Sequence, residues 1–103
     1  MLFRSSNTTQ YKSVGCYRIQ SKPFGPMLSK LVLNTRDKVK TVAECARLAW
    51  NRARRVFALG GNGECYGSMD GHLVYHKDGA SSDCVDNLIG GPNSAYVFAL
   101  TGE

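Results

Sequence analysis

The sequence predicts an α+β domain in which one helix packs across an antiparallel β-sheet and two disulfides tie the elements together. Residues 41–55 have the apolar spacing of a helix. Residues 56–68 have the pattern strand, glycine-rich turn, strand. Four cysteines are spread over these and neighbouring segments. A chain of 103 residues, 43% of them hydrophobic, is long enough for one domain with a small core.

The expected helix, residues 41–55, begins with a capping box in which Thr41 and Glu44 bond each other's exposed amides. Small apolar residues then recur at helical spacing, and they would let the helix approach a sheet closely. Trp50 lies at the edge of this stripe and is expected to cover the core with its indole N–H in water. The stripe comprises Val42, Cys45, Ala46, Ala49 and Ala53.

The expected hairpin follows the helix directly. Residues 56–59 are apolar and short enough for a strand. The turn that follows, residues 60–63, has glycine at three of four positions, which allows the chain to double back tightly. Cys65 then falls on the second arm, where a crosslink to Cys45 would join hairpin and helix.

Two further strands are expected at residues 14–19 and 94–100. The apolar run 27–33 is expected to be an irregular core segment or a short strand, and the run 73–76 a short strand. Residues 1–12 are polar and expected to form a flexible segment, which leaves 13–103 as the domain. Side chains expected to share a strand face are Tyr17 with Ile19, Val14 with Cys16, and Tyr96 with Phe98 and Leu100.

Four cysteines in so short a chain indicate two disulfides and an oxidising compartment, hence a secreted or extracellular protein. Three connectivities are possible, and we favour Cys45–Cys65 with Cys16–Cys84. Closing the shorter loop, of about 20 residues, is worth about 3 kcal/mol in the chain-entropy model. Reduced thiols or a zinc site are the alternatives, but the sequence has no Cys-x-x-Cys pair.

The N-terminal region also bears on export. It lacks the apolar core of a signal peptide, so we expect a removed signal or a segment of a longer protein. Asn7 begins an Asn-Thr-Thr glycosylation sequon. The sequence has no apolar run that would span a bilayer, and no membrane insertion is expected.

The net charge of +5 is unevenly distributed along the chain. Either the basic part is a solvated helix face, or it attracts anionic polymers. Nucleic acid is an unlikely partner, because aromatic residues are not interleaved with the basic ones. The basic residues are Arg36, Lys38, Lys40, Arg47, Arg52, Arg54 and Arg55, and the acidic ones are Glu64, Asp70, Asp78, Asp83 and Asp86.

Several short motifs follow one another along the chain: Gly15-Cys16-Tyr17, residues 41–46, residues 56–59, residues 63–67, Tyr75 ahead of Cys84, Gly90-Gly91 and Tyr96-Val97. Their order and spacing resemble the WSC-like modules of secreted and cell-surface proteins, especially short forms in marine invertebrates. This resemblance implies a PAN/apple-like fold, with a helix across an antiparallel sheet, and carbohydrate or matrix adhesion rather than catalysis. The chain departs from the family in carrying only four cysteines.

Catalysis is not expected. The sequence has no Gly-x-Ser-x-Gly elbow, and its carboxylates are spread over loops rather than paired. His72 and His76 are four residues apart, which would suit a metal on a helix, but the local residues favour a turn and a strand. We therefore predict no enzyme activity, no metal and no cofactor.

Carbohydrate recognition is the favoured function, because sugars need planar polar groups beside an aromatic ring. The alternative is an adhesive module that self-assembles or binds a protein in an extracellular matrix, with a homo-oligomer as one form. Each candidate residue also has an ordinary structural explanation, as a strand or turn residue. The predicted ligand-binding residues are Glu64, Tyr66, Tyr75, Asp83 and Asn87, with His72 and Asn93 as further candidates.

Overall fold

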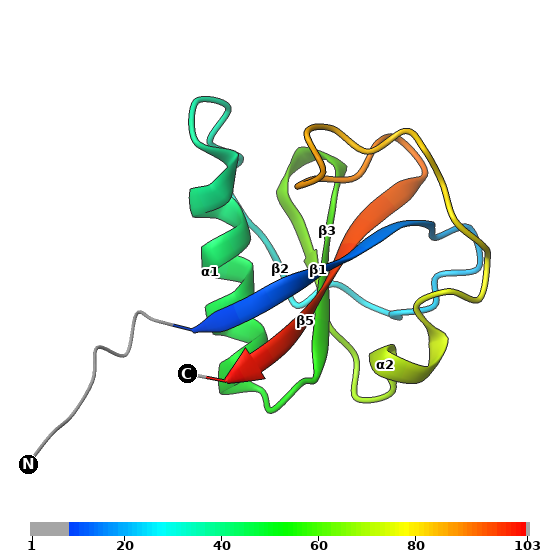
Figure 1. The fold of residues 1–103 in the computed structure, drawn as a ribbon, viewed down its shortest axis with the longest axis horizontal. Coiled ribbons are helices and arrows are strands. Elements are labelled where there is room, and N and C mark those ends of the chain that lie inside the picture. The colour runs from blue at the N-terminus through cyan, green and yellow to red at the C-terminus, as the bar shows by residue number, and fades with distance from the viewer. Residues whose placement is uncertain (1–8, 103) are drawn as a thin grey trace, which may run out of the picture.

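The computed structural model describes residues 9–102, and these form one antiparallel five-stranded sheet with a long helix on one face (Figure 1). This confirms the α+β class predicted from the sequence. The strands lie in the order β1-β5-β3-β4-β2, so the first and last strands of the chain are neighbours. The elements are β1 (Gln10–Arg18), β2 (Ser29–Lys30), α1 (Lys38–Asn51), β3 (Val56–Gly60), η1 (Gly61–Gly63), β4 (Glu64–Tyr66), α2 (Gly71–Val74) and β5 (Ser94–Gly102).

The sheet separates two groups of buried side chains. β3 is buried along its whole length, and successive residues alternate between the two groups, as strand geometry requires. On the α1 side, Phe57 stacks on Phe98 with ring centroids 5.0 Å apart. On the opposite side, Phe24 covers Val56 and Ala58 of the same strand. The loop that carries Phe24 therefore acts as the second cover of the sheet.

The helix presents its predicted small residues to the sheet, but its ends differ from the prediction. Val42, Cys45, Ala46 and Ala49 are completely buried. The N-cap is Asp37, whose carboxylate accepts from the Lys40 amide, so the Thr41–Glu44 capping box was wrong. Thr41 is buried within the helix, and its hydroxyl accepts instead from the Asn34 amide at 3.1 Å.

The C-terminal end of α1 lies four residues before the expected one. Ala53 has a φ of 58° and lies outside the helix, exposed, so its predicted place on the buried stripe was wrong. The amide of Ala53 donates to the Trp50 carbonyl, and the amide of Arg54 donates to the Ala49 carbonyl, both at 3.0 Å. These two bonds form a Schellman motif, with alanine in the position where glycine is usual.

The predicted hairpin is confirmed. β3 and β4 pair antiparallel, with Leu59 opposite Cys65, and Asn62 adopts a φ of 63° in the connecting turn. The apolar run 27–33 contributes only the two-residue strand β2, which pairs with β4. Residues 85 and 89 form an isolated bridge within the loop before β5.

β1 begins at Gln10, so residues 10–12 of the predicted flexible segment belong to the sheet. A register shift between Ser13 and Gly15 inserts a bulge into the pairing with β5. As a result Val14 packs with Tyr17, away from α1, rather than sharing a face with Cys16 as predicted. Tyr96, Phe98 and Leu100 do face α1 together, as expected.

The predicted strand at residues 73–76 was wrong, because Gly71–Val74 form the short helix α2. Gly71 lies against Val56 and Phe24, where a Cβ atom would stand 2.9 Å from the Val56 side chain. A residue larger than glycine at position 71 would therefore have to displace the Val56 side chain. His72 lies on this helix, and His76 follows it with its ring 4.8 Å from that of Tyr75.

Both predicted disulfides are present. Cys45–Cys65 joins α1 to the hairpin and is completely buried, whereas Cys16–Cys84 joins β1 to the loop before β5 and is half-buried. The sequon at Asn7 lies outside the described residues.

Candidate functional site

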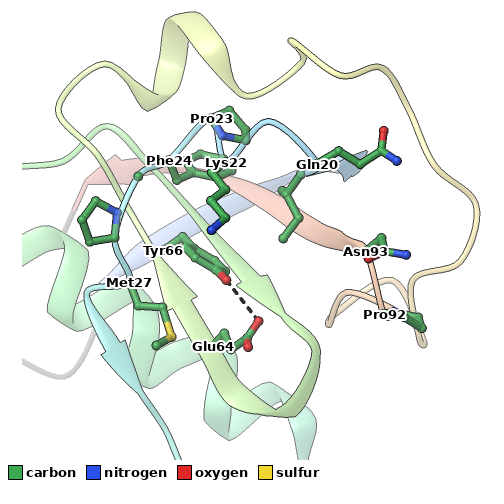
Figure 2. Close-up of a pocket in the computed structure, with 12 residues that line it drawn as sticks. Gln20, Lys22, Pro23, Phe24, Met27, Glu64, Tyr66, Pro92 and Asn93 are labelled. Carbon is green, nitrogen blue, oxygen red and sulfur yellow. Dashed lines mark hydrogen bonds between the residues drawn. The ribbon is translucent and has the colours of Figure 1, made fainter.

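A cleft of about 650 Å³ lies on the sheet face away from α1, between the loop after β1, strand β4 and the turn before β5 (Figure 2). Its wall is mostly apolar, with a few polar side chains directed into or around it. This combination is typical of small-ligand sites. The lining residues are Ile19, Gln20, Lys22, Pro23, Phe24, Gly25, Pro26, Met27, Glu64, Tyr66, Pro92 and Asn93.

The loop over the cleft is held by backbone and side-chain bonds. The Lys22 amide donates to the Ile19 carbonyl and the Gly25 amide to the Lys22 carbonyl, both at 3.0 Å. Lys22 has a φ of 54°, an unfavourable conformation for a residue other than glycine. The Asp78 carboxylate accepts from both the amide and the hydroxyl of Ser21, at 2.7 and 2.9 Å, which lowers the Asp78 pKa. The loop is therefore anchored at several points.

Tyr66 and Glu64 form the polar centre of the cleft. They are two residues apart on β4 and so share a face of the strand. The Tyr66 hydroxyl donates to Glu64 Oε1 at 3.1 Å. Burial, the nearby Glu64 charge and this hydrogen bond together raise the pKa of Tyr66 to about 12. The phenol is therefore a hydrogen-bond donor to the carboxylate over an even wider pH range than an ordinary tyrosine.

The surroundings hold this pair in position. The ring of Phe24, itself buried, stacks on that of Tyr66 with centroids 6.1 Å apart. Gly60 lies directly beneath the pair, because a Cβ there would stand 2.7 Å from Glu64 Oε1 and 3.0 Å from the Tyr66 ring. A larger residue at position 60 would therefore displace both side chains.

Figure 2 shows how charge is arranged around the pair. The Lys22 side chain extends from the loop toward Tyr66, while Met27 lies beside Glu64, and Pro92 and Asn93 close the far side. Among residues 9–102, Lys22 and Glu64 form no ion pair, although both line the cleft. The cleft thus offers a carboxylate, a phenol and an ammonium for hydrogen bonds to a polar ligand, with the Asn93 amide at its far edge.

The predicted ligand-binding residues do not all meet here. Glu64 and Tyr66 are brought together, and Asn93 also lines the cleft. Tyr75 instead packs on Tyr17, with ring centroids 5.0 Å apart. Asp83 accepts from the hydroxyl of Ser81 at 2.6 Å, and hydrogen bonds from Ser81 and Ser94 lower its pKa.

Asn87 is exposed in a turn with a φ of 55° and does not line the cleft.

Sequence reasoning missed the contribution of the loop after β1, above all Lys22, Phe24 and Met27. The prolines and glycine of this loop indicated only a break in structure. Phe24, an aromatic residue between two prolines, was the one signal that the loop packs on the protein.

The metal-binding potential of the described chain is limited to one group of three possible ligands, Cys16, Asp83 and Cys84. Both cysteines of this group are bonded to each other, so neither offers a thiolate. The prediction that the protein needs no metal remains a prediction.

Comparison with protein-family models, curated proteins and solved structures gives no match in any of the three. Within the described range, no helix has the length and apolar character needed to cross a bilayer.

Proposed function

We propose that this protein is a secreted, non-enzymatic binding module that recognises carbohydrate in the cleft beside β4. The observation that carries the proposal is the Tyr66–Glu64 pair, a phenol bonded to a carboxylate on the floor of a partly apolar cleft. Carboxylate oxygens accept hydrogen bonds from sugar hydroxyls, and apolar rings suit the C–H face of a sugar. Two disulfides are consistent with an extracellular location.

The set of ligand-contacting residues that we propose differs from the set predicted from the sequence, because it omits the residues outside the cleft and adds Lys22. It comprises Glu64, Tyr66, Asn93 and Lys22, which line one cleft. The fixed geometry of the pair supports this choice, because a preorganised carboxylate loses little entropy when a ligand binds. The WSC-like resemblance points to the same function but does not define the site.

A glycan array tests the proposal, followed by titration of any ligand found with matched variants. Glu64→Gln should weaken binding about tenfold or more, since it replaces a charged acceptor. Glu44→Gln is the control, because it makes the same chemical change on an exposed part of α1. Binding should persist at moderate salt, since hydrogen bonds supply it. An array without ligands, or equal binding by both variants, would refute the proposal.

Self-assembly as an adhesive module is the second candidate, and the segregation of charge favours it. α1 and the basic segment after it lie on one side of the molecule, and much of the loop 76–93, which carries three aspartates, extends on the other (Figure 1). One of the three, Asp86, pairs with Lys38 at the start of α1 at 3.2 Å, which leaves Asp78 and Asp83 for the acidic side. A contact between the basic side of one copy and the acidic side of another would not close and would form chains. Light scattering across a salt series tests this, and a monomer at low salt would exclude it.

A further inference from the structure

A cluster of arginines surrounds the point where the chain leaves α1 and enters β3. We call it the arginine surface and define it by Arg47, Trp50, Arg52, Arg54 and Arg55. Three of its arginines fall within the four residues that separate α1 from β3. Arg47, Arg52 and Arg55 are exposed, and Trp50 retains 38% of its accessible surface.

Capping of the helix does not account for this cluster. The terminal carbonyls of α1 are already bonded by backbone amides, from Arg52 and Arg54 to Ala49 and from Ala53 to Trp50, at 3.0–3.1 Å. Nor do ion pairs account for it, because within residues 9–102 no carboxylate lies within salt-bridge distance of any of these four arginines. Their charges are therefore directed at solvent rather than neutralised by the described part of the protein.

Arg54 is held in place more firmly than a surface arginine usually is. Its Nε donates to the Gly67 carbonyl and its Nη1 to the Arg52 carbonyl, both at 3.1 Å. The guanidinium is thus fixed across the gap between the end of α1 and the end of β4. Its Nη2 donors take part in neither bond, and they need little further ordering to meet a ligand.

We propose that the arginine surface binds a sulfated polysaccharide. Guanidinium groups present pairs of N–H donors that match the oxygens of an anionic ester, and they are more weakly hydrated than ammonium groups. A sulfated chain carries such anions at short intervals, so one chain can meet several of these guanidinium groups at once. Nucleic acid fits less well, because only one aromatic residue, Trp50, accompanies the arginines and bases need a series of stacking surfaces.

This site is separate from the cleft beside β4. The cleft residues Phe24 and Tyr66 pack on the sheet face opposite α1, whereas Trp50 and Arg47 belong to α1 itself. Loss of one site should leave the other intact, so this inference stands or fails independently of the proposed function. With both sites occupied, one module would hold two polysaccharide chains on opposite sides of its sheet.

The experiment measures binding of a highly sulfated heparin oligosaccharide, and of its desulfated form, across a salt series. Arg47→Gln combined with Arg55→Gln should weaken binding about tenfold near physiological salt. The matched control, Arg18→Gln combined with Lys77→Gln, removes the same charge from the end of β1 and from the segment after α2, and it should change binding less than about twofold. Wild-type binding should also alter Trp50 fluorescence, a readout that does not depend on how a variant folds.

Several results would overturn the proposal. An equal loss in the control would show that only net charge matters. Equal affinity for the desulfated oligosaccharide would remove the role of sulfate. Equal affinity for single-stranded DNA of the same length would make the surface a general polyanion site. Salt-sensitive self-association without heparin binding would assign the arginines to assembly instead.

Discussion

Replacing Ala53 with glycine should stabilise this protein. Ala53 occupies the left-handed position that ends α1, with a φ of 58° and an amide bond to the Trp50 carbonyl. Glycine adopts this conformation without steric penalty, and alanine does not. Ala53 is exposed, so removing its methyl group should lose little packing energy.

The magnitude follows from two opposing terms. The left-handed conformation costs an L-residue about 1–2 kcal/mol. Glycine loses more conformational freedom on folding than alanine, which offsets roughly 0.5–1 kcal/mol of the gain. The two terms leave roughly 0–1.5 kcal/mol, and we expect Ala53→Gly to raise the free energy of unfolding by about 0.75 kcal/mol, the centre of that range. For a domain of this size, that corresponds to roughly 2–6 °C in Tm.

Equilibrium unfolding in guanidinium chloride measures this change as a rise in the midpoint at constant slope. Ala43→Gly is the matched control, because Ala43 is exposed in the interior of α1, where glycine should destabilise by about 1 kcal/mol. The two identical substitutions should thus have opposite signs. If Ala53→Gly is neutral or destabilising, the Schellman end of α1 is wrongly described.

Three further predictions concern the cap, the cleft and the disulfides. Asp37→Ala should lower the free energy of unfolding by about 1 kcal/mol through the lost N-cap, and an unchanged midpoint would contradict the assigned start of α1. The raised pKa of Tyr66 stabilises the fold below pH about 10, the pKa of tyrosine in the unfolded chain, and this contribution should disappear as pH rises through about 12. The free energy of unfolding should therefore decline across that pH range in the wild type, and the part of the decline due to Tyr66 should be absent from Tyr66→Phe. Mild reduction followed by alkylation and mass spectrometry should open the half-buried Cys16–Cys84 before the completely buried Cys45–Cys65, and the reverse order would contradict the burial described here.

The sequence by itself determined the elements whose signals are local. The small apolar stripe of α1 repeats with the helical period, and only a face packed on a sheet needs such residues. The glycine-rich turn set the hairpin, because few other residues allow the chain to reverse there. With Cys45 on the helix and Cys65 on the hairpin, a disulfide between them was the favoured pairing, and it left Cys16 and Cys84 to form the second disulfide.

Where local sequence signals competed, only the tertiary structure decided which conformation formed. Thr41 carries a capping pattern, yet it lies buried against the segment before α1, where its hydroxyl bonds the Asn34 amide and leaves the cap to Asp37. The strand-like run 73–76 does not join the sheet, because Gly71–Val74 form a helical turn whose first residue packs closely on Val56 and Phe24. No local pattern foretells such contacts between distant segments.

The cleft depends on tertiary structure in the same way. Glu64 and Tyr66 were both among the ligand-binding residues predicted from the sequence, and their two-residue spacing on β4 places them on one face of the strand. Their role as the floor of a cleft arises only when the loop after β1 folds back and buries Phe24 against Tyr66. Periodicity says which way a side chain points, but which distant loop will cover it depends on the packing of the whole chain.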